Sequence, residues 1–342
     1  MIELPRPNRV PAVGAASGNR VDWVDIAKGL AMVLVVLYHV CLFMVARHLT
    51  PADWNRVNGF LQPVRMPLFM LTSGLFAQKM IKMAWLPVLR TRVALMIYLY
   101  VVWLFMFFVV HNLLPDAVRH RGYAKASNLI TGLYWPTNAL WYLYAIAIFI
   151  VLAKLLSRVP IPVQLGLALA SAVWIQYDNY VRFPYTNFFE YFLYFLIGLH
   201  LKDVVIEIGR RASWALLAGG LASYAAFDLL KNVLHFPAFK VGISIAGVAT
   251  AVVISSMLVG THVGAVLNKI GQNTLPIFLM FDMWIALWTW VLMQGHKFPG
   301  SPLVVTALVV ISGLVMHRLL MWAHCRWLFE LPSLPVKKKV AA

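Results

Sequence analysis

The chain has little charge and little cysteine for its length. Only 12% of its 342 residues are charged, while 62% are hydrophobic, whereas soluble domains average roughly 25% charged residues. So little polar surface cannot cover a water-soluble globule, and a lipid bilayer is the expected solvent. The two cysteines, Cys41 and Cys325, have neither CxxC nor metal-ligand spacing, which argues against a disulfide framework and a metal site.

Acidic residues are also scarce, which leaves a net charge of +17. A nucleic-acid partner would explain such a charge if the basic residues formed one stripe or tail. Instead they fall in short clusters between apolar runs. Clusters of this kind orient membrane proteins and attract anionic lipids or substrates, so we expect no nucleic-acid partner.

Ten apolar runs divide the chain, most of them close to the roughly 20 residues that a helix needs to cross a bilayer. They lie at 28–46, 58–78, 94–114, 138–156, 162–178, 187–201, 213–231, 241–261, 273–294 and 302–324. The fifth and sixth runs are the shortest. The pattern predicts an all-α polytopic membrane protein with about ten transmembrane helices.

The distribution of Lys and Arg predicts the orientation. With a cytoplasmic N-terminus, the inner connecting segments hold roughly twice as many Lys and Arg as the outer ones, as the positive-inside rule requires. We therefore predict a multi-pass protein of the cell (inner) membrane, N-in and C-in. We expect a disordered cytoplasmic tail at 1–20, a transmembrane domain at 21–325 and a basic cytoplasmic tail at 326–342.

Ionisable residues inside apolar runs are the first candidates for function, because a charge at the bilayer centre costs about 2.5–3.5 kcal/mol. His39 lies three helical turns, about 16 Å, past Lys28 and on the same face. Asp25 lies close to that face at the cytoplasmic mouth. This arrangement predicts a polar tunnel wall that leads to an imidazole. The alternative is a core histidine bonded to a neighbouring helix.

The second apolar run carries Arg65 between Pro63 and Pro67, followed by Ser73. Proline removes a backbone donor and clashes with the preceding turn, so this helix is expected to kink or unwind. Freed carbonyl groups are tolerated only beside protein or a water-filled cavity. Arg65 lies at a depth comparable to His39; the alternative is an arginine that extends to the outer headgroups.

Further polar candidates follow along the chain. Arg90 and Arg92 stand at the cytoplasmic mouth of the third run, where two guanidinium groups can hold phosphate. Positive-inside anchoring explains them equally well. Trp141, Glu190 and Asp282 lie within or beside later runs, as packed polar groups or as parts of a polar core.

The order of these residues resembles the acyltransferase 3 family of membrane proteins. That family opens with a basic residue, an Asp, a Lys-Gly or Arg-Gly pair and an apolar stretch that ends in His. Arg20, Asp25, Lys28, Gly29 and His39 match this pattern in place. The family's second signature, a Met-Pro-Leu-Phe run that closes in Ser-Gly, resembles residues 66–74.

Three later motifs are similar but weaker. They are the basic pair Arg90 and Arg92, the segment 140–142 (Leu-Trp-Tyr) and the segment 271–275, which resembles a Gly-x-x-Ser-Leu motif. The chain departs from the family in the spacing of the basic pair, which is usually R-x-x-R. Phe281 also stands where a second histidine is common, which puts a role for that histidine in doubt.

The resemblance implies a membrane-bound O-acyltransferase of the sugar or polysaccharide O-acetylase type. Its donor would be cytoplasmic acyl-CoA, most simply acetyl-CoA, used as a substrate and not as a bound cofactor. Its acceptor would be a carbohydrate, a glycan or another exported molecule, and many acceptors of the family lie on the other side of the bilayer. Under this reading, His39 acts as general base, while Arg65 or Ser73 stabilises the oxyanion.

The remaining roles follow from the same resemblance. Arg90, Arg92 and Lys28 would hold the donor, and Asp25 would pair with Lys28 at the entrance. The residues expected to support the site are Asp25, Arg20, Trp141, Glu190 and Asp282.

Two other classes of function stay open from the sequence. A secondary transporter or flippase would also have kinked helices and buried charge, although no two-halves repeat supports it. A non-catalytic membrane scaffold is the other class, but it does not explain why an ionisable His39 lies behind Asp25 and Lys28 in an apolar helix.

Overall fold

The structure is a computed structural model that describes residues 22–136, 138–178, 180–295 and 302–332. The described residues form helices and connections without a strand, which confirms the all-α class. The helices are α1 (Asp22–Val45), α2 (Trp54–Lys82), α3 (Trp85–Val88), α4 (Ala94–Leu113), α5 (Arg121–Ala124), α6 (Ser127–Tyr134), α7 (Trp141–Leu155), α8 (Ile161–Trp174), α9 (Tyr185–His200), α10 (Lys202–Arg210), α11 (Trp214–Leu234), α12 (Phe239–Met257), α13 (His262–Gln272), α14 (Thr274–Met293) and α15 (Pro302–Trp322).

Each of the ten apolar runs falls on a helix: α1, α2, α4, α7, α8, α9, α11, α12, α14 and α15. In the described part of the chain, 6 helical segments are long and apolar enough to cross a membrane. They are Asp22–Val45, Trp85–Leu113, Trp141–Arg158, Phe239–Met257, Thr274–Met293 and Pro302–Trp322. These segments fit a multi-pass membrane protein, and the count of ten crossings stays a prediction.

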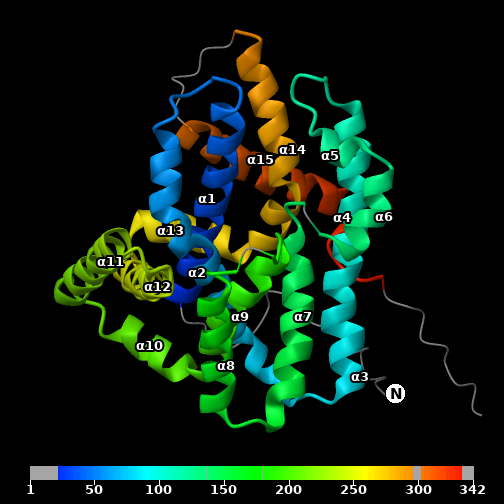
Figure 1. Cartoon of the computed structure of the whole chain (residues 1–342). Coiled ribbons are helices and arrows are strands. Elements are labelled where there is room, and N and C mark those ends of the chain that lie inside the picture. The colour runs from blue at the N-terminus through cyan, green and yellow to red at the C-terminus, as the bar shows by residue number, and fades with distance from the viewer. Residues whose placement is uncertain (1–21, 137, 179, 296–301, 333–342) are drawn as a thin grey trace, which may run out of the picture.

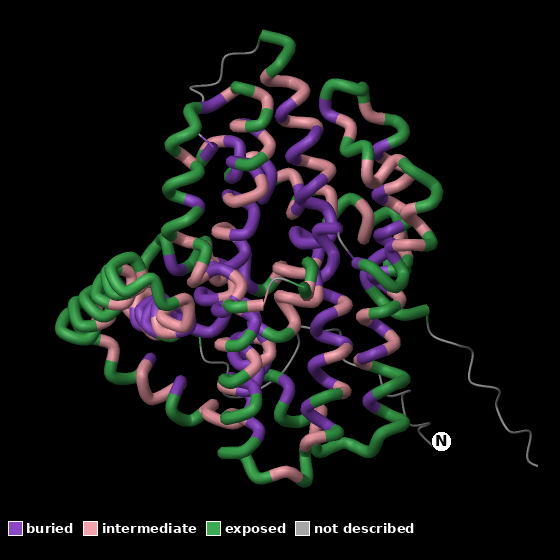
Figure 2. Tube along the Cα trace, viewed as in Figure 1, coloured by how far each residue is buried: buried purple, intermediate pink, exposed green. Residues whose placement is uncertain are grey.

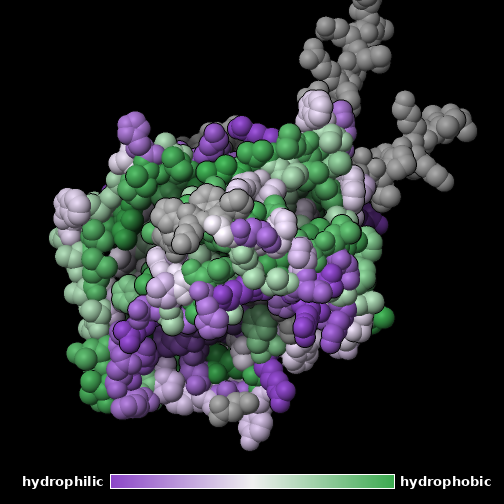
Figure 3. Space-filling model, turned by 90° about the horizontal axis from the view of Figure 1, so that it is seen from above, coloured by the Kyte–Doolittle hydropathy of each residue, from purple (hydrophilic) through white to green (hydrophobic). Residues whose placement is uncertain are grey.

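The helices form an elongated bundle with two distinct ends (Figure 1). The α1–α2 connection and α5 lie at one end, and α3 and the α7–α8 turn lie at the other. Seen from the α5 end, hydrophilic side chains gather in a band, and hydrophobic side chains occupy much of the rim (Figure 3). A polar end and an apolar rim are what a bilayer-embedded bundle requires.

Helix α1 lies at the centre of the fold and packs against α2, α12, α13, α14 and α15. Buried residues concentrate along α1 and its neighbours, whereas α11 is largely exposed (Figure 2). The exposed residues of α11 include Leu221, Leu229 and Val233. Apolar residues exposed on this scale are suited to contact with lipid.

Two pairs of helices meet backbone to backbone at glycines. A Cβ atom added to Gly29 of α1 would collide with the Leu267 carbonyl of α13, and one added to Gly271 would collide with the Asp25 carbonyl. Helices α2 and α9 meet in the same way at Gly74 and Gly198. Small residues permit this close approach in membrane helix pairs. The glycines therefore fix how α1 packs against α13 and how α2 packs against α9.

The two prolines of the second run lie inside α2, which is helical from Trp54 to Lys82. Of the two outcomes expected for this segment, a kink or unwinding, unwinding is therefore wrong, and the kink stays a prediction. The helix persists because α2 is held on both sides, by α1 and α9, and neighbouring helices can compensate for the missing backbone donors.

We predict that Gly271→Ala destabilises the protein, because the new methyl group would meet the Asp25 backbone, which cannot move aside cheaply. Overpacking of this kind costs about 1–3 kcal/mol. The matched control is Gly166→Ala in α8, where a Cβ meets nothing within 4 Å and a small gain from helix propensity is expected. Thermal unfolding of both variants in detergent checks this, and equal melting temperatures would contradict it.

Candidate active site

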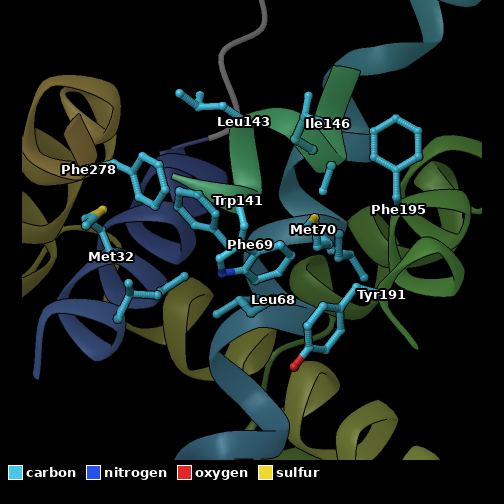
Figure 4. Close-up of a cluster of buried hydrophobic side chains, with 14 of the residues drawn as sticks. Met32, Leu68, Phe69, Met70, Trp141, Leu143, Ile146, Tyr191, Phe195 and Phe278 are labelled. Carbon is cyan, nitrogen blue, oxygen red and sulfur yellow. The ribbon is translucent and has the colours of Figure 1, made fainter. Parts of the chain in front are cut away.

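A buried hydrophobic cluster joins most of the long helices, and Figure 4 shows part of it. Met32 of α1, Phe69 of α2, Trp141 of α7, Tyr191 of α9 and Phe278 of α14 all belong to it. The Trp141 ring stacks on Tyr191 with centroids 5.9 Å apart. Trp141, expected to support the site, is therefore a core aromatic at the start of α7.

His39 lies in the C-terminal half of α1, between aromatic rings and charged groups. Its ring is 4.9 Å from Tyr38 and 5.0 Å from Phe281, centroid to centroid. Asp282 and Arg65 are the charged side chains that act on it electrostatically. Within the described residues, the ring has no hydrogen-bond partner. This part of the chain therefore does not show a core histidine that is hydrogen-bonded to a neighbouring helix.

Lys28 and Asp25 form the expected pair at the start of α1, with 2.9 Å between Nζ and Oδ1. The ammonium also lies 4.1 Å from the centre of the Phe76 ring. A cavity of about 430 Å³ opens nearby between α1 and α13, lined by Asp22, Ile26 and His262 among others. It does not extend to His39, and a continuous tunnel stays a prediction.

The Arg65 side chain turns inward toward α1. It is 6% exposed, and its Nη1 donates to the Asn58 carbonyl at 3.0 Å. Its guanidinium lies 4.0 Å from the centre of the Tyr38 ring, a favourable cation–π geometry. Arg65 therefore packs beside Tyr38, the residue that precedes His39, and its side chain does not extend to the surface of the bundle.

Ser73 lies deeper in α2 and is already hydrogen-bonded. Its hydroxyl donates to the Phe69 carbonyl at 2.8 Å and lies 2.6 Å from the Tyr142 hydroxyl. Because serine has a single proton, Tyr142 is the donor of that second bond. The Tyr142 ring touches Phe278, which touches Phe281 beside His39. Ser73 is thus linked to His39 through aromatic rings and is not its direct neighbour.

Arg90 and Arg92 lie on a single π-helical turn, Leu89–Val93, just before α4. Such turns are rare and frequently mark functional sites. Side chains two residues apart on a helical turn do not face each other, so one phosphate group cannot easily be held by both arginines. Arg90 is exposed and Arg92 is partly exposed, which leaves both accessible from the α3 end of the bundle.

Two further residues were expected to support the site, Glu190 and Arg20. Glu190 of α9 forms an ion pair with Lys240 of α12 at 3.4 Å. Arg20 lies outside the described residues.

Sequence reasoning missed one buried partner, His111 of α4. Its Nε2 lies 2.9 Å from Oδ2 of Asp282, and the two side chains are 0% and 7% exposed. Its Nδ1 accepts the backbone N–H of His120 at 3.2 Å. The signal was present, since His111 is an ionisable residue inside the run 94–114, as His39 is in the first run.

His120 lies in the connection between α4 and α5 and covers this pair from the α5 end of the bundle. Its ring stacks on Tyr123 at 4.2 Å, and burial lowers the pKa of His120 from its ordinary value. A neutral ring suits this aromatic contact. The structure thus brings His39, Arg65, Asp282 and His111 into one region and leaves the arginine pair at the opposite end.

Comparison with known proteins gives one family and one informative relative. A family model described as an acyltransferase domain matches residues 21–318. The inner membrane protein YcfT of Escherichia coli (strain K12) is 25% identical, over 92% of this chain and 96% of that protein. No solved structure matches. Since the family model covers most of the chain, the protein belongs to the acyltransferase 3 family that its motifs resemble.

Proposed function

We propose that the protein is an integral-membrane O-acyltransferase that moves an acyl group, most simply acetyl, from cytoplasmic acyl-CoA to a hydroxyl of a carbohydrate or other exported acceptor. The observation that carries the proposal is the environment of His39. Its imidazole has no hydrogen-bond partner among the described residues, and it stands where both Asp282 and Arg65 act on it.

His39 acts as general base in this proposal. A neutral ring nitrogen takes the proton of the acceptor hydroxyl while the hydroxyl oxygen attacks the thioester carbon. The carbon–sulfur bond then breaks, and the proton passes from His39 to the departing sulfur. Arg65 is the stronger candidate for stabilising the oxyanion, because its cation lies beside Tyr38 on the same helix as His39. Ser73 is the weaker one, since its proton is engaged by Phe69.

Arg90, Arg92 and Lys28 hold the CoA moiety in this proposal. The geometry of their turn supports contact of each arginine with a different phosphate group. Lys28 retains partial exposure beside Asp25, at the start of α1. The two arginines form stronger contacts with phosphate than Lys28 does, because a planar guanidinium group donates two parallel hydrogen bonds.

The proposed topology has ten crossings with both termini in the cytoplasm. The alternation of the first connections between the two ends of the bundle supports it (Figure 1). The name of the YcfT relative, an inner membrane protein, supports the inner membrane as the location. A transporter or flippase is not favoured, because family membership points to acyl transfer.

We predict that a reporter fused at Lys338 is cytoplasmic and that one inserted within residues 115–137 is external, because basic residues favour the inner side. Paired alkaline phosphatase and green fluorescent protein fusions measure this, each reporter serving as the control for the other. An external C-terminal reporter would rule out an even number of crossings with the N-terminus inside.

We predict that His39→Gln lowers kcat by about 10²–10⁴-fold, because an amide keeps hydrogen bonds but cannot take the proton. The KM for acetyl-CoA should change little, since the arginine pair lies at the other end of the bundle. Transfer from labelled acetyl-CoA in membranes, normalised to protein level, measures both. The matched control is His317→Gln in α15, whose ring packs on Phe329. Near-normal turnover of His39→Gln would make the histidine structural.

We predict that Arg90→Ala and Arg92→Ala each weaken CoA binding by about tenfold or more, as expected for a lost hydrogen bond between charged groups. Lysine should restore binding only in part, because the planar fork is lost. Calorimetry with CoA and purified protein measures this without an acceptor. Arg158→Ala, an exposed arginine beside the α7–α8 turn, controls for general loss of positive charge. Unchanged affinity in both variants would return the pair to a topological role.

A further inference from the structure

The buried pair of His111 and Asp282 is not explained by the stability of the fold. The two residues come from α4 and α14 and are 171 positions apart, and their side chains are almost inaccessible. Burying ionisable groups costs several kcal/mol per ion, so a buried pair is weak support for stability. Ionisable residues at membrane depth usually have a functional role.

The hydrogen bonds determine which partner carries charge. Nδ1 of His111 accepts a proton from the His120 backbone, so it carries none of its own. The ring must then carry its single proton on Nε2, which faces Oδ2 of Asp282. A doubly protonated His111 would direct an N–H group at the N–H of His120. His111 is therefore a neutral donor, and it does not cancel the charge of Asp282.

The segment around α5 holds this arrangement in place. The Tyr123 ring lies 4.9 Å from the ring of His111 and 4.2 Å from that of His120. Its hydroxyl accepts the backbone N–H of Ala139 at 3.1 Å. These contacts fix His120, and through its backbone they fix the tautomer of His111.

Asp282 is close enough to the proposed base to act on it electrostatically. It follows Phe281, whose ring contacts His39 at 5.0 Å. Of the two charged groups that act on His39, Arg65 opposes a positive imidazole and Asp282 favours one. A general base becomes a buried cation when it takes its proton, and a buried cation needs a counter-charge.

We propose that Asp282, held by the neutral His111, supplies the counter-charge for the imidazolium that forms on His39 during acyl transfer. This inference rests on the proposed function of His39. The proton moves from the acceptor hydroxyl to His39 and later to the leaving sulfur, and none passes to Asp282. Asp282 and His111 are positioning residues that act through His39 without contacting the substrate.

Two substitutions at Asp282 separate charge from hydrogen bonding. Asp282→Asn keeps an oxygen that accepts from His111 but removes the charge, so kcat should fall about 10- to 100-fold, as expected for one charge beside a buried cation. The KM for acetyl-CoA should stay within about twofold. Asp282→Glu keeps the charge and should retain more activity. If the pair were purely structural, Asp282→Asn would retain more activity than Asp282→Glu, and that result would overturn the inference.

Substitutions at His111 test its role as a donor. His111→Gln offers both a donor for Asp282 and an acceptor for the His120 N–H, so it should retain most activity. His111→Phe leaves the carboxylate without that donor and should lower kcat as Asp282→Asn does. Loss of activity in His111→Gln at normal protein level, or full activity in His111→Phe, would overturn the inference.

A double-mutant cycle tests whether Asp282 acts through His39. In the His39→Gln background, Asp282→Asn should lower the residual rate by less than about twofold, because no imidazolium forms. If the double variant lost the product of the two single-variant reductions in rate, the inference would be overturned. The control Asp228→Asn removes a carboxylate from an exposed pair with Lys231 on α11 and should leave the rate unchanged.

A wild-type protein without acyl transfer overturns the proposed function as well, whereas an active wild type with a fully active Asp282→Asn overturns this inference alone.

Discussion

The backbone contact between α1 and α13 at Gly29 and Gly271 is the constraint on which the site depends. It fixes the position of α1 along its neighbour, and His39 lies ten residues further along α1. Helix α13 leads through Asn273 directly into α14, which carries Phe281 and Asp282. The same crossing therefore orients both helices that define the surroundings of His39. A side chain at either glycine would separate them, which is why this position in the motif needs glycine.

Several polar side chains of the bundle interior are paired with another side chain or with a backbone carbonyl. Arg65 donates to the Asn58 carbonyl, Glu190 pairs with Lys240, and Asp282 accepts from His111. Such pairing is the usual condition for keeping polar groups in an apolar interior. His39 has rings and charges around it but no hydrogen-bond partner in the described part of the chain. A general base needs this freedom to accept a proton from a substrate.

Much of the helical framework could be predicted from the sequence, because each apolar run is a local property that marks its own helix. His39 stood out for the same reason, and the pairing of Asp25 with Lys28 follows from their spacing on one helix. The pairing of His111 with Asp282 could not be predicted, because it depends on how α4 and α14 meet. The inward turn of Arg65, the bonds of Ser73 and the π-helical turn at Arg90 and Arg92 likewise depend on packing.

The central claim is that the chain transfers acyl groups to an exported acceptor by means of His39. Mass spectrometry of surface glycans tests it most directly, in cells that lack the protein and in cells that express either the wild type or His39→Gln at equal level. The account predicts acylated glycans, heavier by one acyl group per modified hydroxyl, only with the wild type. Identical glycan masses in all three strains, or full modification by His39→Gln, would contradict it.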